Sequence, residues 1–262
     1  MPTVQLRNFT IHYAQEGKGH PLIILHGLGN NSQSWKNQLS ALKDNFTVIA
    51  WDAPGYGKSS DPAEEFKHFS QFADVLKEFV DTLGYESIHL LGHSMGSAIA
   101  IDFAYRFPNL VDKLIIADPT RGAAGLSKEE NAKRLQERLD SINNLDPSEL
   151  AKQRAGNLLS PNAPEEIVRE AERIMSQVRP PGYRSVSYSL GNLNQMSILP
   201  SISVPTLVIC GELDKVTPVS EAEIFHQSIL DSKLEIIPDT GHLCYQEDPE
   251  TFNEKIVRFL EK

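Results

Sequence analysis

A serine within a Gly-X-Ser-X-Gly string is the first residue of the sequence whose surroundings point to chemistry. Ser94 stands between Gly92 and Gly96, directly after an apolar run and directly before an alanine-rich segment. Small residues on both sides let neighbouring backbone approach a serine at a sharp strand-to-helix turn, where its hydroxyl is exposed for nucleophilic attack. Because a serine hydroxyl is a weak nucleophile near neutral pH, this interpretation also requires a base and a residue that orients the base.

His242 and Asp214 are the candidates for these two roles. His242 follows the last strand-like run of the sequence, and Asp214 follows the run before it. The carboxyl ends of parallel strands meet at one edge of a sheet, so we expect both side chains to lie near Ser94. The chain order serine, aspartate, histidine is that of a known catalytic arrangement. Asp118, at the end of another strand-like run, is the rival acid, and Glu212 is a weaker one.

A glycine-rich loop at 26–29 could stabilise the negative charge that develops on a substrate oxygen. It follows the first apolar run and contains the residues His-Gly-Leu-Gly. Backbone N–H groups aimed at the reacting centre form an oxyanion hole, and we expect Leu28 and Met95 to supply them. A plain strand-to-helix turn is the alternative role of the loop. His26 is expected to brace the loop, and His93 to pack in the turn around the serine.

The elements that must position these residues alternate between strands and helices. Six continuous apolar runs are typical of strands buried on both faces, and they lie at 22–25, 46–50, 88–91, 114–117, 206–210 and 234–237. Two alternating segments, 4–7 and 9–13, precede them and predict paired strands. Apolar stripes with helical spacing occur at 35–42, 69–83, 95–107 and 249–260. This alternation predicts a mostly parallel α/β sheet with helices on both faces.

One long segment breaks the alternation. Residues 121–196 contain several helical stripes, punctuated by prolines, and no strand-like run. We therefore predict a helical cap at 121–196, inserted into a core domain made of 1–120 and 197–262. A packed decoration that only adds stability is one role for such a cap. A lid over a binding site is favoured, because the insertion leaves the edge of the sheet where open α/β sheets bind ligands.

The composition excludes several classes of partner. The 262 residues include 25 Lys and Arg against 35 Asp and Glu, and a formal net charge of −10 argues against nucleic-acid and membrane partners. Cys210 and Cys244 are too few for a disulfide framework and are expected to be reduced. No targeting segment or membrane span is recognised, which predicts a cytoplasmic protein. His89 and His93 are four residues apart, but they are predicted to lie in a strand and a turn and so cannot converge on zinc as two histidines on one helix face do; neither metal nor cofactor is expected.

The motifs together resemble the α/β-hydrolase superfamily over nearly the whole chain. Besides the string at 92–96, the family's loops match His-Gly at 26–27, Asp-X-X-Gly-X-Gly-X-Ser at 52–59, Gly-X-X-Asp at 211–214 and Gly-His at 241–242. The resemblance implies an eight-stranded sheet whose second strand is antiparallel, with a helical cap after the sixth. Within the superfamily, the segments 27–35 and 52–60 look most like the group of 3-oxoadipate enol-lactonases and small carboxylesterases.

These observations predict a hydrolase of carboxylic esters or lactones that acts through an acyl-enzyme, with a small-molecule substrate. Haloalkane dehalogenases and epoxide hydrolases have an aspartate at the position of Ser94, so the resemblance disfavours those reactions. Two alternatives stay open. One is a carbon–carbon bond hydrolase of diketone ring-fission products, although the loop after His-Gly is not the usual one of that group. The other is a small-molecule receptor or signalling protein that keeps the fold and the triad.

The residues that contact the substrate are predicted from side-chain type and position alone. The candidate apolar walls of a pocket are Trp35, Leu126, Leu158, Tyr183 and Tyr188, and ordinary packing in the core of the cap is the alternative role of each. Arg121 and Arg184, in or beside the cap, are candidate partners for a substrate carboxylate, because arginine pairs with carboxylates in bidentate geometry. Arg179 is a further candidate. The oligomeric state is expected to be a monomer or a homodimer.

Overall fold

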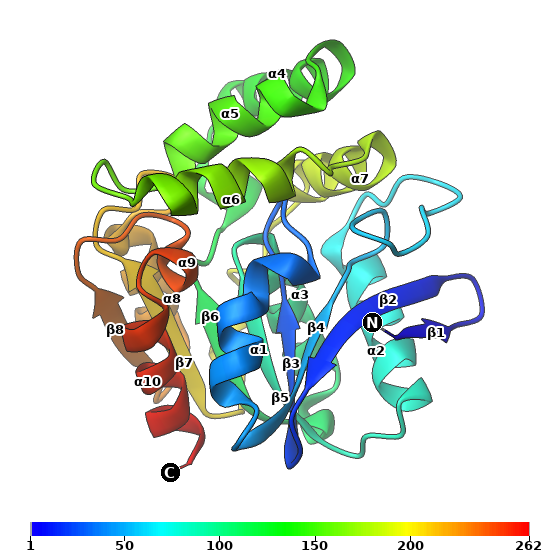
Figure 1. Cartoon of the computed structure of the whole chain (residues 1–262), viewed down its shortest axis with the longest axis vertical. Coiled ribbons are helices and arrows are strands. Elements are labelled where there is room, and N and C mark those ends of the chain that lie inside the picture. The colour runs from blue at the N-terminus through cyan, green and yellow to red at the C-terminus, as the bar shows by residue number, and fades with distance from the viewer. Residues whose placement is uncertain (1, 262) are drawn as a thin grey trace.

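An eight-stranded sheet runs through the centre of this computed structural model, which describes residues 2–261 (Figure 1). The strands are β1 (Thr3–Gln5), β2 (Thr10–Glu16), β3 (His20–Leu25), β4 (Phe46–Trp51), β5 (Ile88–His93), β6 (Val111–Ala117), β7 (Thr206–Gly211) and β8 (Lys233–Ile237). Their spatial order is β1-β2-β4-β3-β5-β6-β7-β8. β2 pairs antiparallel with β1 and β4, and all other pairs are parallel. The predicted mostly parallel sheet with an antiparallel second strand is confirmed.

Helices cover both faces of the sheet, as the alternation in the sequence predicts. They are α1 (Lys36–Leu42), α2 (Phe69–Thr82), α3 (Met95–Arg106), α8 (Val219–Ser228), α9 (Cys244–Glu247) and α10 (Pro249–Leu260). Ile23 and Leu25 of β3 belong to the core under α2, α3 and α8. Leu22 and Ile24 belong to the core under α1, α9 and α10. Because successive side chains of a strand point to opposite faces and both faces are covered, all four are apolar and fully buried.

Local signals in the sequence set the ends of these helices. α3 stops before Pro108, which cannot continue a helix. Gly84, with φ of 77°, follows the end of α2 in the left-handed conformation that glycine adopts at no steric cost. α10 begins at Pro249, and the side chain of Asp248 accepts a hydrogen bond from the Thr251 N–H. The ends of α2 and α3 and the start of α10 thus follow from short-range chemistry.

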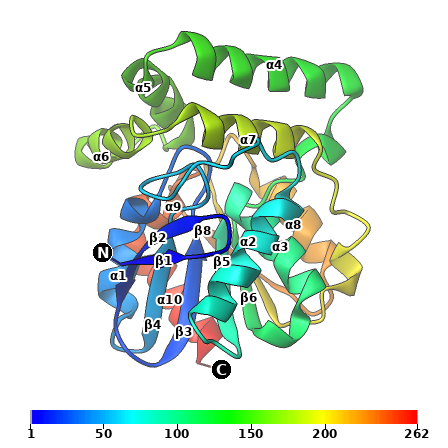
Figure 2. The same ribbon diagram turned by 90° about the vertical axis from the view of Figure 1, so that its right-hand side faces the viewer.

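Four helices between β6 and β7 form a layer above the carboxyl ends of the strands (Figure 1, Figure 2). They are α4 (Lys128–Asn144), α5 (Pro147–Leu158), α6 (Glu165–Met175) and α7 (Pro180–Gly191). The predicted helical cap after the sixth strand is therefore present. The division of the chain into a separate cap domain at 121–196 and a core at 1–120 and 197–262 stays a prediction.

The cap packs closely on the loops beneath it. A Cβ on Gly55 would lie 2.4 Å from the Cα of Gly182 in α7, so the two backbones touch where only glycine fits. The remaining short helices are η1 (Ser32–Trp35), η2 (Pro108–Leu110), η3 (Gly122–Gly125) and η4 (Leu199–Ser201), all of the 3-10 type. Among residues 2–261, no helix combines the length and the apolar character needed to cross a bilayer.

Candidate active site

Ser94 occupies the turn between β5 and α3 in a conformation that residues other than glycine rarely adopt. Its φ is 55° and its ψ is −114°. The turn is so tight that a Cβ on Gly92 would lie 2.2 Å from the carbonyl oxygen of Gly96. A Cβ on Gly96 would lie 2.4 Å from the carbonyl oxygen of Leu25. Both glycines of the Gly-X-Ser-X-Gly string are thus required by close backbone approach, and the serine carries the strain.

His242 and Asp214 are in direct contact beside this turn. His242 Nδ1 lies 2.7 Å from Asp214 Oδ2, and both side chains are buried. The carboxylate is fixed on its other side by the N–H groups of Val216 and Thr217, which donate to Oδ1 over 2.7 and 3.1 Å. The hydroxyl of Thr217 donates to Oδ2 over 2.8 Å. Because the carboxylate accepts from Nδ1–H, Nε2 is left as the basic nitrogen of the ring.

The electrostatics of the pair favour an ionised aspartate and a basic imidazole. Burial alone would lower the pKa of His242, but the charge of Asp214 and the hydrogen bond to it outweigh burial and raise the pKa. Asp118 adds a smaller effect in the same direction. Burial likewise opposes ionisation of Asp214, yet His242 and the hydrogen bonds from Thr217 lower the pKa of that carboxyl. The imidazole is therefore a stronger base than an isolated histidine.

Ser94 and His242 line the same cavity. Within residues 2–261, the hydroxyl of Ser94 makes no hydrogen bond to the imidazole ring. In enzymes without substrate such contacts are often long, and they shorten when the substrate binds. The hydroxyl and the imidazole thus share one cavity, and the Asp214 carboxylate binds the imidazole at Nδ1.

The rival acids have other partners. Asp118 accepts a hydrogen bond from the Gly211 N–H over 2.9 Å and one from the Cys244 thiol over 3.2 Å. It thereby ties the end of β6 to β7 and α9. Glu212 accepts a hydrogen bond from the Asp239 N–H over 3.1 Å. Of the three candidate acids, Asp214 is the one hydrogen-bonded to the imidazole.

The loop at 26–29 lies against the serine turn. A Cβ on Gly27 would lie 2.7 Å from Nδ1 of His93 and 3.2 Å from the Cβ of Ser94. His26 braces this loop: its Nδ1–H donates to the Gly27 carbonyl over 2.9 Å, and its Nε2 accepts from the Ala53 N–H over 3.1 Å. Burial lowers the pKa of His26 to about 4. A neutral, doubly hydrogen-bonded ring has a structural role here, as expected from the sequence.

The two residues predicted to form an oxyanion hole flank the serine. Leu28 lines the cavity that contains Ser94. Met95 is the first residue of α3, and the first N–H groups of a helix have no acceptor within the helix. Both N–H groups therefore belong to segments that meet at the serine. Their role as donors to a developing oxyanion is taken up as a proposal below.

A small cavity of about 130 Å³ lies between the cap and these loops. The core contributes Leu28, Ser94 and His242 to its wall. The cap contributes three arginines, Arg134, Arg138 and Arg154, together with the apolar side chains Leu158 and Leu190. A cavity of this size is well below the 300–1,000 Å³ of pockets for drug-sized ligands, which points to a small substrate.

Of the predicted apolar walls, Leu158 lines this cavity, whereas Trp35, Leu126, Tyr183 and Tyr188 do not. Trp35 is fully buried and stacks on Tyr245, with ring centroids 4.0 Å apart. It packs beneath the serine turn as core. Tyr183 is 1% exposed, and its hydroxyl accepts a hydrogen bond from Arg154 over 3.2 Å. Tyr183 therefore stands behind a residue of the cavity wall and is not part of the wall.

The predicted carboxylate partners also lie elsewhere. Arg121 forms a bidentate pair with Glu221 of α8, at 2.9 and 2.7 Å. Arg184 pairs with Glu65 and donates to Asn143 over 3.1 Å. Arg179 pairs with Asp61 at 2.8 Å. These arginines fasten the cap to the core or to itself, so the structure does not bring them to the cavity.

The three arginines that line the cavity are not among the residues predicted from the sequence to contact a substrate. Arg134 and Arg138 are four residues apart and so share one face of α4. Arg154 precedes Leu158, another cavity residue, by the same spacing in α5. This four-residue spacing is a weak signal of a binding site, because charged residues on an amphipathic helix usually face solvent. The spacing shows a shared face, but the direction of that face depends on how the cap packs.

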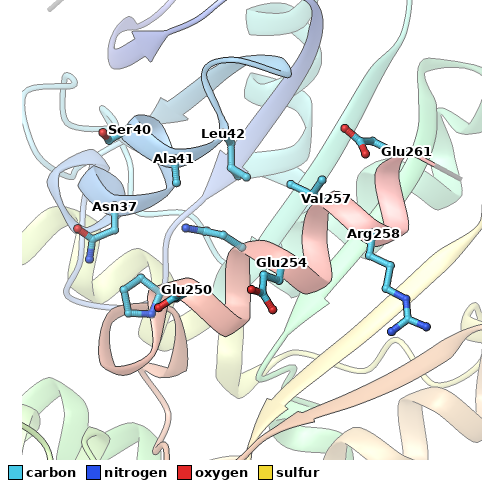
Figure 3. A pocket seen from close by; sticks show the side chains of 11 residues that line it. Asn37, Ser40, Ala41, Leu42, Glu250, Glu254, Val257, Arg258 and Glu261 are labelled. Atoms are coloured by element: carbon cyan, nitrogen blue, oxygen red, sulfur yellow. The ribbon is translucent and has the colours of Figure 1, made fainter.

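A larger groove lies away from the candidate active site, on the face of the sheet that α1 and α10 cover. It has a volume of about 770 Å³ and is formed by α1 and α10. Leu42 and Val257 lie between the two helices, and Glu250, Glu254 and Glu261 flank them (Figure 3). None of the candidate catalytic residues belongs to its wall.

Between residues 2 and 261, three groups of His, Cys and Asp side chains have their metal-ligand atoms within 4.8 Å of one another. Two of them share residues with the site: one contains His242 and the other Asp214. In the third, at the opposite end of the sheet, His20 and Asp112 already form a 2.9 Å ion pair beside His89. In the two groups that share residues with the site, Asp118, Asp214 and Nδ1 of His242 are engaged in the hydrogen bonds described above.

Known proteins are similar to this chain in sequence and in fold. A family model described as the alpha/beta hydrolase fold matches residues 20–249. The chain is 26% identical over 265 residues to 3-oxoadipate enol-lactonase 2 of Acinetobacter baylyi, covering 99% of this chain and 96% of that protein. It is 27% identical over 273 residues to 2-hydroxy-6-oxononadienedioate/2-hydroxy-6-oxononatrienedioate hydrolase of a Pseudomonas species, covering 97% and 92%.

A solved structure of a thermophilic esterase from Thermogutta terrifontis, with malate bound, superposes with a TM-score of 0.92. It is 26% identical, and the match covers 100% of this chain and 98% of that chain. The family model spans most of the sequence, from the start of β3 to the start of α10. The chain therefore belongs to the alpha/beta hydrolase fold family.

Proposed function

We propose that the protein hydrolyses small carboxylic esters or lactones through a covalent acyl-enzyme, with Ser94 as nucleophile. The 2.7 Å contact between His242 and Asp214, on the cavity that contains the strained serine, is the observation that carries the proposal. The similar esterase and enol-lactonase support this reaction class.

The residues have the following roles. His242 Nε2 accepts the hydroxyl proton as Ser94 Oγ attacks the carbonyl carbon, and the N–H groups of Leu28 and Met95 donate to the oxyanion. The carbon–oxygen bond to the leaving group breaks, and His242 returns the proton to the leaving alkoxide. Water then loses a proton to His242 and attacks the acyl carbon, which releases the acid and restores the serine. Asp214 holds the imidazole in its Nδ1–H tautomer throughout.

A carbon–carbon bond hydrolase is the second candidate, because the similar Pseudomonas enzyme is named for a ring-fission product. The two reactions are separated by assaying p-nitrophenyl acetate, γ-butyrolactone and a ring-fission dienoate with the same purified protein. Turnover of the ester or lactone at least tenfold above that of the dienoate supports the proposal. A preference for the dienoate replaces it with the second candidate.

A fluorophosphonate label tests the nucleophile directly. The reagent forms a covalent adduct with an activated serine, and mass spectrometry of the digested protein is expected to place the adduct on Ser94. Ser94→Ala is expected to abolish labelling and turnover. Ser40→Ala, at an exposed position of α1, is the matched control and should keep both. Labelling and turnover that survive in Ser94→Ala would overturn the proposal, and tight binding of a small molecule without turnover would favour a receptor.

A further inference from the structure

Two arginines face the cavity at Ser94 without an acidic partner. Among the described residues of the cap, six arginines each form an ion pair with Asp or Glu, and these are Arg121, Arg134, Arg169, Arg173, Arg179 and Arg184. Within residues 2–261, Arg138 and Arg154 form none, although the chain has ten more acidic than basic residues. The two unpaired guanidiniums are also cavity residues.

Arg154 is held in place and is partly unsatisfied. Its Nη1 donates to the hydroxyl of Tyr183 over 3.2 Å, and its Nη2 makes a long 3.5 Å contact with the carbonyl oxygen of Leu28. Its Nε is buried and has no hydrogen-bond partner within the described chain. A buried donor without a partner is unfavourable by about 1–3 kcal/mol, more when it is charged, and a ligand that accepts from it removes that penalty.

Arg138 shares the same positive environment. Burial lowers the pKa of its guanidinium, and the charges of Arg154 and Arg134 act in the same direction. Arginine nevertheless stays protonated near neutral pH. Like charges facing a small cavity repel one another, so an anion between them is favoured over a neutral ligand of the same shape.

We propose that Arg138 and Arg154 form a carboxylate subsite, so that the substrate is a small ester or lactone that carries a second, free carboxylate. This inference rests on the proposed function for the scissile bond, but the binding of the carboxylate does not depend on it. Arginine suits the role because its planar fork donates two parallel hydrogen bonds to a carboxylate. The contact of Arg154 with the Leu28 carbonyl places the subsite next to the loop that is expected to bind the oxyanion.

Two methyl esters of equal length test the subsite. Monomethyl glutarate carries a terminal carboxylate, whereas methyl pentanoate ends in a methyl group. We expect kcat/KM of the unmodified protein to be at least tenfold higher for monomethyl glutarate, when acid release is followed in a pH-stat. Arg138→Gln and Arg154→Gln should each lower that value by about 10- to 100-fold, mainly through KM, because a hydrogen bond to a charged group is lost.

Controls separate charge recognition from folding. The ratio of kcat/KM for monomethyl glutarate to kcat/KM for methyl pentanoate should fall at least tenfold in both glutamine variants, and Arg154→Lys should retain part of this preference. Arg169→Gln, an exposed and ion-paired position of α6 outside the cavity, should leave both esters unaffected. Equal kcat/KM values for the two esters in the unmodified protein, or an unchanged preference in both glutamine variants, would overturn the inference.

A binding measurement keeps the inference independent of turnover. Calorimetric titration of Ser94→Ala with glutarate should show binding that weakens at least tenfold when Arg138→Gln or Arg154→Gln is added. If methyl pentanoate is not hydrolysed and the fluorophosphonate does not label Ser94, the proposed function fails while this titration still decides the subsite. Guanidinium pairs also bind phosphate, so the same titration is carried out with inorganic phosphate at equal ionic strength. Phosphate that binds more tightly than glutarate would overturn the assignment to carboxylates.

Discussion

The backbone N–H of His242 donates a 2.7 Å hydrogen bond to the carbonyl oxygen of Leu158, the last residue of α5. The loop of the proposed catalytic base is thus fastened to the cap as well as to the sheet. Its neighbour Gly241 has no room for a side chain, because a Cβ there would lie 2.7 Å from that same carbonyl oxygen. The contact between cap and base is therefore made backbone to backbone.

Gly241→Ala should consequently impair catalysis more than folding. The added methyl must displace either Leu158 or the histidine loop, and a shift of about 1 Å at reacting groups can lower the rate by about 100-fold. We expect kcat to fall by about 10- to 100-fold for methyl pentanoate. Gly156→Ala, also at the cap but with open space around the new Cβ, is the control. It should keep kcat and raise the stability of α5 by up to about 1 kcal/mol. Equal kcat values for both variants would contradict the expectation.

Substitution of the serine should separate strain from chemistry. Ser94→Ala and Ser94→Gly are both expected to lower kcat by about 10⁶-fold, as loss of the nucleophile does in serine proteases. Glycine, however, adopts the observed φ of 55° with little strain, whereas alanine does not. Urea denaturation should therefore show Ser94→Gly more stable than Ser94→Ala, by about 1–3 kcal/mol. Identical midpoints would show that the turn stores no strain at this residue.

The two buried aspartates near the imidazole should differ in their effect on rate. Asp214→Asn removes the acceptor that fixes the tautomer of His242, and the protease precedent gives a loss of about 10⁴-fold in kcat. Asp118→Asn can keep its acceptor for the Gly211 N–H and should reduce kcat by less than about tenfold. Steady-state rates with p-nitrophenyl acetate measure both. A larger loss from Asp118→Asn would exchange the roles of the two acids.

The pH profile should report the raised pKa of His242. The imidazole must be neutral to accept the serine proton, so kcat/KM should fall as the pH drops through a pKa above the ordinary 6.5. Asp118→Asn removes a charge that raises this pKa and should move the acidic limb to lower pH. An acidic limb below pH 6 in the unmodified protein would contradict the assignment.

The pKa shifts of His242 and Asp214 change the pH dependence of folding stability in opposite directions. The raised pKa of His242 stabilises the folded protein below the unfolded-state value, and this contribution is lost as the pH rises through the folded-state pKa. The lowered pKa of Asp214 stabilises it above the unfolded-state value, and this contribution is lost as the pH falls. Urea denaturation of Asp214→Asn against pH should show a weaker loss of stability on acidification than the unmodified protein.

The sequence predicts the sheet and the positions of Ser94, Asp214 and His242 because each follows an apolar, strand-like run. The strands before Ser94 and Asp214 are buried on both faces, whereas β8, before His242, is a half-buried edge strand. Parallel pairing then brings strand ends to one edge whatever the details of packing. No comparable rule predicts which side chains contact the substrate. Trp35 is as well explained by a core as by a pocket, and only the packing of the cap shows that Arg154 faces inward while Arg184 does not.

Arg154 and Leu158 lie one turn apart in helix α5. Arg154 belongs to the proposed carboxylate subsite, and Leu158 holds the backbone of the proposed base. A substitution that tilts or shifts this helix would move both at once. Replacement of the cap by that of a relative would therefore alter the alignment of the histidine together with substrate preference. On the proposed function, selectivity and turnover are therefore coupled through α5, and a redesigned cap must retain the end of this helix.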